Sequence, residues 1–109
     1  MTETATPVVG PLSGPTGQLV AAHRDELREV LDHHGVKNAR LFGSVARGDD
    51  RAGSDVDLLV QFAPGTSLFT VLRIQDELET ILGVEVDLIP EGGLKERVRE
   101  RIQRDLIAL

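Results

Sequence analysis

The sequence contains no cysteine, tryptophan or tyrosine, and its only aromatic residues are three phenylalanines among 109 residues. The absence of cysteine excludes disulfide bonds and thiolate metal sites, so any metal would be bound by oxygen or imidazole ligands. The scarcity of aromatic side chains argues against a stacking platform for single-stranded nucleic acid. The core must therefore be built from aliphatic side chains.

Long apolar runs and an excess of positive charge are also missing. No run is long enough to cross a bilayer, and the N-terminal stretch MTETATPVVGPLSGPTG lacks the basic start and apolar segment of a signal peptide. The formal net charge of −6 argues against general binding to nucleic acid. We therefore expect a cytoplasmic protein without membrane association and without direct nucleic-acid binding.

The length and composition predict one folded domain with a short leader. Residues 1–17 are mainly Thr, Pro, Gly and small apolar residues without periodicity, which is typical of a disordered segment. Residues 18–109 have the hydrophobic periodicity of a single domain. The predicted organisation is thus a disordered leader, 1–17, followed by a domain, 18–109.

Helical and strand periodicities alternate along this domain. Apolar spacing, glycines and a Ser/Thr cap predict helices at 18–34, after Thr66 or Ser67 to residue 82, and at 94–106, with a helical turn at 44–47. Strands are predicted at 36–42, 55–62 and 84–89. The apolar stripe expected on the second long helix is Leu68, Val71, Leu72, Leu78, Ile81 and Leu82. These elements predict an α+β (α/β-like) fold with a small mixed sheet flanked by helices.

Two acids interrupt the apolar strand at 55–62. Asp55 and Asp57 are two residues apart, so they project from one face of the strand with α-carbons roughly 6–7 Å apart. Asp87 lies in a similar Val-Asp-Leu setting on the next predicted strand. If the two strands are neighbours, the three carboxylates form a cluster that favours Mg²⁺ or Mn²⁺. The alternative is that they only mark solvent-facing strand positions.

The residues before this strand favour the metal hypothesis. Gly43-Ser44 follows a predicted strand and opens a possible helical turn, where free N–H groups and a hydroxyl can bind an anion. Phosphate ligands beside metal-binding carboxylates describe a nucleoside triphosphate site. A P-loop does not fit, because Asp49-Asp50 stands in place of its Lys-Ser/Thr pair. An EF-hand does not fit either, because the acid spacing and the final glutamate are missing.

The full set of motifs resembles a known family. Gly43-Ser44, Arg47-Gly48-Asp49 and the run from Ser54 to Val60 are followed by Val86-Asp87-Leu88, in this order. This pattern is similar to that of the minimal nucleotidyltransferases (MNT) of the DNA polymerase beta superfamily. The resemblance covers roughly residues 18 to 109 and implies the nucleotidyltransferase fold.

The resemblance also implies a role for each motif residue. Asp55 and Asp57 would bind the divalent metals, Mg²⁺ or Mn²⁺. Asp87 would help to bind the catalytic metal and to deprotonate the attacking hydroxyl. Gly43 and Ser44 would bind the triphosphate of ATP, with Arg47 as a further phosphate contact. The implied reaction is in-line attack of a hydroxyl on the α-phosphorus with release of pyrophosphate.

The short chain then restricts the acceptor that the resemblance implies. Larger relatives such as aminoglycoside nucleotidyltransferases carry an acceptor-binding domain, which we do not expect here. Chains of this size resemble the antitoxins of two-gene modules whose partner is a HEPN-domain ribonuclease toxin. The expected function is AMP transfer to a hydroxyl, such as that of a tyrosine, of that toxin within a hetero-oligomer. The alternatives are a non-catalytic antitoxin that acts by binding and a small-molecule nucleotidyltransferase.

Other chemically distinctive residues have plainer expected roles. His33 and His34 point about 100° apart on a helix, so they and His23 are expected at the surface or partly buried without a metal. Three arginines of the last helix are expected on one solvated face, paired with its acids: Arg97, Arg101 and Arg104 with Glu96, Glu100 and Asp105. Docking of a partner or of nucleotide phosphates on that face is the alternative. Asp49 and Asp50 are expected to order the loop through Asx-type hydrogen bonds.

Overall fold

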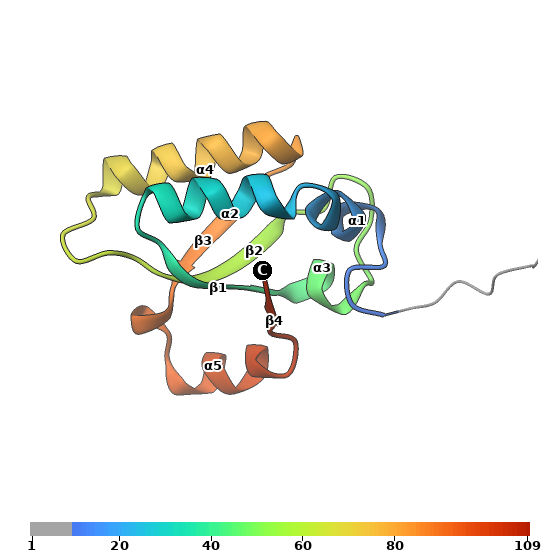
Figure 1. Ribbon diagram of the computed structural model, residues 1–109. Coiled ribbons are helices and arrows are strands. Elements are labelled where there is room, and N and C mark those ends of the chain that lie inside the picture. The colour runs from blue at the N-terminus through green and yellow to red at the C-terminus, as the bar shows by residue number, and fades with distance from the viewer. Residues whose placement is uncertain (1–9) are drawn as a thin grey trace, which may run out of the picture.

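The protein is built around a mixed four-stranded sheet (Figure 1). The computed structural model describes residues 10–109. The sheet has the order β3-β2-β1-β4, in which β1 pairs antiparallel with β2 and β4, and β2 pairs parallel with β3. The strands are β1 (Lys37–Phe42), β2 (Val56–Gln61), β3 (Val86–Pro90) and β4 (Ile107–Ala108). The predicted α+β class and mixed sheet are confirmed.

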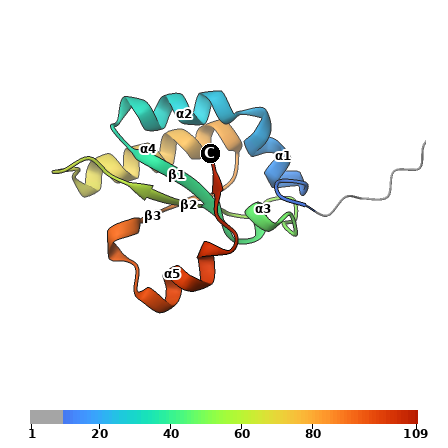
Figure 2. The ribbon, with the colours of Figure 1, turned by 60° about the horizontal axis from the view of Figure 1, so that its bottom comes forward.

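Helices cover the two faces of the sheet unequally. Helices α2 (Arg24–His33) and α4 (Leu68–Leu82) pack on one face, and α5 (Glu96–Gln103) lies on the other (Figures 1 and 2). The alternation along β2 sends Val56, Leu58 and Val60 into the core under α2 and α4, where each is at most 2% exposed. The carboxylate of Asp57 therefore projects from the face on which α5 lies.

The predicted helix at 18–34 is two helices, and that expectation is wrong. Helix α1 (Pro15–Ala22) and α2 are separated at His23, whose φ of −110° and ψ of 17° leave the helical region. The helix breaks because its two parts pack against different elements: α1 contacts α3 (Gly43–Arg47), while α2 lies along the sheet. Periodicity along the chain does not reveal such a change of direction.

The boundary of the folded part also lies earlier than predicted. Helix α1 begins inside the expected leader, and Thr16 and Gly17 are buried. Residues 10–17 therefore belong to the folded unit, which corrects the expected boundary between 17 and 18. The remainder of the predicted disordered leader, residues 1–9, lies outside the described residues.

The C-terminal segment departs from the predicted helix at 94–106. Helix α5 ends at Gln103, and the chain turns to add β4 to the edge of the sheet beside β1. A two-residue strand has no periodicity to detect, and its pairing depends on an edge that only the folded sheet provides. No residue of α5 is buried, so its apolar positions contribute little to the core.

Helix α4 has the predicted ends but a different apolar face. The Ser67 hydroxyl accepts a hydrogen bond from the Thr70 N–H at 3.2 Å, and Gly83 ends the helix in the left-handed region. The buried residues are Ile74, Leu78 and Leu82, whereas Leu68 and Leu72 of the predicted stripe are 71% and 53% exposed. The first turn extends past the sheet edge, so its apolar residues have no surface to cover. No helix within residues 10–109 is long and apolar enough to cross a membrane.

Candidate active site

The three predicted carboxylates lie at the start of two adjacent parallel strands. Asp57 of β2 is in register with Asp87 of β3, and Asp55 immediately precedes β2. The expectation that the two strands are neighbours is therefore confirmed. Asp57 is half-buried, while Asp55 and Asp87 are exposed. The parallel register thus brings together acids that are 30 residues apart in the sequence.

The glycine-serine turn directly adjoins this acidic cluster. Phe42, the last residue of β1, pairs with Asp57, so Gly43 follows beside the carboxylate. Gly43 has a φ of +80°, and a Cβ on it would stand 2.7 Å from Asp57 Oδ2. Both the backbone conformation and the space therefore require glycine. Helix α3 begins here and ends at Gly48, as predicted.

The electrostatic state of Asp57 reflects its surroundings. The pKa of Asp57 is raised to about 6, first by burial and then by the neighbouring charges of Asp87 and Asp55. Loss of solvent and repulsion both disfavour the ionised carboxylate. A cation beside it would reverse both effects, so the cluster is electrostatically suited to a positively charged ligand.

The donor chemistry fits a hard divalent metal. The oxygens of Asp55, Asp57 and Asp87 are the ligand type that Mg²⁺ and Mn²⁺ prefer. As the side chains stand, however, no group of three or more His, Cys, Asp or Glu residues within 10–109 encloses a metal site. The carboxylates would have to rotate toward one another, and the exposed side chains of Asp55 and Asp87 are free to do so.

A fourth acid, Glu85, joins the cluster and was missed in the sequence. The pKa of Glu85 is raised, mainly by the negative charge of Asp55 and by a hydrogen bond with it, with smaller effects of burial, Asp87 and Glu79. Glu85 and Asp87 are two residues apart, the same spacing as Asp55 and Asp57. This alternation was the signal that could have identified Glu85.

Arg47, the predicted phosphate contact, is held by two carboxylates. Its Nε donates to Asp49 at 3.2 Å and its Nη1 donates to Asp105 at 3.1 Å. Hydrogen bonds with Asp49 and then Asp105 are the main causes that raise its pKa. A phosphate at Arg47 would compete with these acids, so its role stays a prediction. The Arg47–Asp105 pair connects α3 to the turn before β4.

The arginine face of α5 differs from the expected paired surface. Asp105, one of the expected partners, binds Arg47 instead. Within the part of the chain that the structure describes, Arg97, Arg101 and Arg104 form no salt bridge. These arginines line an open hollow of about 290 Å³ together with Glu100. The expected pairing is therefore wrong: Glu100 lines the same hollow as the arginines but forms no salt bridge with them.

The three histidines lie away from the carboxylates, as expected. His23 Nδ1 lies 2.8 Å from Glu26 Oε1, and His34 Nε2 lies 2.8 Å from Glu77 Oε2. His33 is exposed. The first contact lies at the start of α2, and the second joins the end of α2 to α4.

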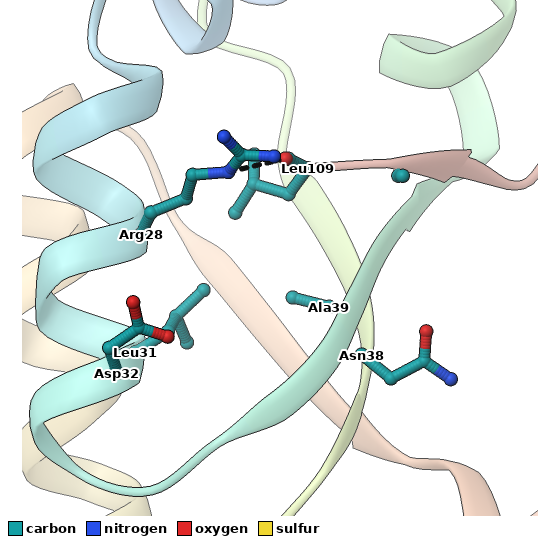
Figure 3. Close-up of a pocket in the computed structure, with 7 residues that line it drawn as sticks. Arg28, Leu31, Asp32, Asn38, Ala39 and Leu109 are labelled. Atoms are coloured by element: carbon teal, nitrogen blue, oxygen red, sulfur yellow. Dashed lines mark hydrogen bonds between the residues drawn. The ribbon is translucent and has the colours of Figure 1, made fainter.

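A separate hollow lies between α2, β1 and the C-terminal residue (Figure 3). It has a volume of about 250 Å³ and is lined by Arg28, Asp32, Asn38 and Leu109 among others. The Arg28 Nε donates to the Leu109 carbonyl oxygen at 2.8 Å across it. Neither this hollow nor the α5 hollow is lined by the predicted site residues.

Comparison with known proteins identifies the family of this chain. The model of the nucleotidyltransferase domain matches residues 23–109. The chain belongs to the nucleotidyltransferase domain family. A protein of Thermococcus cleftensis named protein adenylyltransferase MntA is 36% identical over 89 residues, covering 82% of this chain and 87% of the relative. A candidate protein adenylyltransferase of Methanocaldococcus jannaschii is 40% identical over 78 residues, covering 72% and 84% of the two chains.

Solved structures confirm the nucleotidyltransferase fold. A candidate minimal nucleotidyltransferase superposes with a TM-score of 0.75 and is 42% identical, covering 84% of this chain and 94% of that one. An antitoxin of the MNT type, in complex with a tri-AMPylated HEPN toxin of Shewanella oneidensis, superposes with a TM-score of 0.62. At 16% identity, covering 81% and 69% of the two chains, this second likeness shows the fold alone. The predicted family and fold are confirmed, and the chain is a nucleotidyltransferase.

Proposed function

We propose that this nucleotidyltransferase transfers AMP from ATP to a hydroxyl of a partner protein, a HEPN-domain toxin, and thereby neutralises it. The observation that carries the proposal is the register of Asp57 with Asp87 beside Gly43, in a chain whose curated relatives are named protein adenylyltransferases. The MNT–HEPN complexes among its structural neighbours support the choice of partner.

Each site residue has a part in the proposed transfer. Asp55, Asp57 and Asp87 would hold Mg²⁺ or Mn²⁺, which neutralises phosphate charge when bound. The N–H groups and hydroxyl of Gly43 and Ser44 would bind the triphosphate. The acceptor oxygen forms a bond to the α-phosphorus, the bond to the bridging oxygen breaks, and pyrophosphate leaves. Asp87 would help to accept the proton of the acceptor hydroxyl.

The open position of the site favours a macromolecular acceptor. The carboxylates of Asp55 and Asp87 are exposed, and none of the three lines the hollows beside α2 or α5. A small molecule would need a concave site that buries most of its surface. A protein can instead bring its own surface to an exposed site, so a toxin hydroxyl fits better than a small-molecule acceptor.

The purified chain and its candidate HEPN partner provide the test. Incubation with Mg²⁺ and ATP labelled at the α-phosphate is expected to label the partner, with a mass increase of one or more AMP groups. Asp57→Asn should abolish labelling, while the exposed control Asp76→Asn on α4 should retain it. Protection of cells from the toxin by Asp57→Asn at the wild-type level would favour neutralisation by binding. An unchanged partner mass in all samples would refute AMP transfer.

A further inference from the structure

Residues 10–22 precede the part of the chain that matches the family model, yet they pack against the site. The match begins at residue 23, whereas Thr16 and Gly17 are buried against the loop that joins α3 to β2. This loop, residues 49–54, connects the glycine-serine turn with Asp55 and Asp57. Its position therefore affects how the two halves of the site are placed relative to each other.

The buried carboxylate of Asp50 links the loop to α1. Asp50 is only 8% exposed, and its Oδ2 accepts hydrogen bonds from the N–H groups of Thr16 at 2.8 Å and Gly17 at 3.2 Å. These amides belong to the first turn of α1, where N–H groups have no partner within the helix. The Thr16 hydroxyl donates back to the Arg51 carbonyl oxygen at 3.0 Å. These three hydrogen bonds join the loop to the helix, while Asp50 Oδ1 is buried without a hydrogen-bond partner among the described residues.

Two glycines lie where an added side chain would collide with the residues that form this contact. A Cβ on Gly14 would stand 1.9 Å from Asp50 Oδ1. A Cβ on Gly48 would stand 1.9 Å from the carbonyl oxygen of Gly10 and 2.7 Å from the Ser13 hydroxyl. Because Gly48 is the residue that ends α3, the N-terminal segment touches both the phosphate turn's helix and the following loop.

The loop itself is closed by short hydrogen bonds. The Arg51 N–H donates to the Ser54 hydroxyl at 2.8 Å, and the Ser54 N–H donates to the Arg51 carbonyl oxygen at 3.0 Å. These bonds connect the residue after Asp50 to Ser54, which directly precedes Asp55. A shift of about 1 Å in reacting groups can lower a rate by roughly 10²-fold.

We propose that Asp50 and residues 10–17 form an N-terminal clamp that sets the distance between the phosphate turn and the metal-binding strand. Asp50 is a positioning residue, which acts through the loop and does not touch substrate. The segment 10–17 is consequently part of the nucleotidyltransferase machinery of this chain. The effect on catalysis rests on the proposed function, whereas the clamp's effect on the loop does not.

Two substitutions disturb the clamp from opposite sides. Asp50→Ala removes the acceptor, and Gly14→Ala pushes a methyl group into the same carboxylate. Each is expected to lower kcat/KM for ATP by about 10- to 100-fold, given the sensitivity of such reactions to position. Asp50→Asn should lower kcat/KM for ATP less, because its side-chain carbonyl oxygen can still accept a hydrogen bond from one N–H group. The matched control Asp76→Ala, an exposed aspartate of α4, should stay within about twofold of wild type.

The double variant Gly14→Ala/Asp50→Ala tests whether the two substitutions disturb the same contact or act independently. It should be no worse than Asp50→Ala alone, because once the carboxylate is gone the added methyl group has nothing to displace. Multiplicative losses in kcat/KM would overturn the clamp. So would an unchanged kcat/KM for ATP in Asp50→Ala, measured well below its unfolding temperature, because a purely stabilising contact lowers the midpoint alone.

Hydrogen exchange on the full chain provides a readout that does not depend on catalysis. Asp50→Ala should increase amide exchange in residues 43–57 relative to both wild type and Asp76→Ala. Unchanged exchange there would overturn the clamp even if activity fell. If the wild type transfers no AMP, the proposed function fails, and the exchange experiment still decides whether Asp50 fixes the loop. If Asp50→Ala does not fold, Asp50→Asn and Gly14→Ala carry the same comparison.

Discussion

Replacement of Asp57 by Asn should abolish transfer and, in the absence of metal, stabilise the fold at neutral pH. The native environment raises the pKa of Asp57 from 3.8 to about 6, through burial first and the charges of Asp87 and Asp55 second. The native state therefore binds more protons than the unfolded state between these values. The contribution of Asp57 to the free energy of unfolding consequently falls as the pH rises from about 4 to about 6, and it is constant above that window. Asn carries no charge, so it escapes this penalty.

The magnitude follows from the size of the pKa change. The rise from 3.8 to about 6 converts to an upper limit of about 3 kcal/mol. Asp57 is half-buried, and the solvent that still reaches it screens the repulsion. This screening reduces the expected gain in the free energy of unfolding to roughly 1–1.5 kcal/mol at pH 7.5. At pH 4 the two proteins should differ little.

Urea unfolding of wild type and Asp57→Asn in EDTA, at several pH values from 4 to 8, measures this difference. Addition of Mg²⁺ should then stabilise the wild type more than the variant, because a cation relieves the repulsion only where the carboxylate exists. A variant that is less stable than wild type at pH 7.5, or a stability difference between the two proteins that does not grow between pH 4 and 6, would refute the electrostatic reasoning.

Four further substitutions test the fold and the turn. Gly43→Ala places a methyl group 2.7 Å from Asp57 Oδ2 at a φ of +80°, so it should abolish AMP transfer and lower the unfolding midpoint in a thermal melt. Ser67→Ala removes the side-chain cap of α4 and should cost about 1 kcal/mol in urea unfolding. Ile74→Ala, at a fully buried position, should cost about 2–5 kcal/mol. Leu72→Ala on the exposed side of the same helix should cost less than about 1 kcal/mol, and equal losses would contradict the assigned burial.

Local signals in the sequence were sufficient for most elements of the fold. The alternation around Asp57, the glycine that ends α4 and the serine that caps it all act within a few residues, so the pattern carries them. The same signals failed where a contact with a distant segment determines where an element ends or which residues it buries. Periodicity extended α5 to residue 106, although the chain leaves the helix to pair β4 with β1. The predicted burial of the apolar residues at the start of α4 was wrong for the same reason, since burial depends on which segment packs against the helix.

The candidate site, too, could be predicted from the sequence only in part. Asp55, Asp57, Asp87 and the Gly43-Ser44 turn were identified from residue types and spacing, because a turn glycine and alternating acids are local features. The sequence alone was therefore sufficient to predict the family and the strand faces, and it supplied the proposed metal and phosphate ligands. Only the tertiary structure decided that Asp57 lies in register with Asp87, that burial raises its pKa, and that Asp50 joins the loop to α1. These are contacts between segments about 30 residues apart, and their geometry exists only once the sheet and helices have packed.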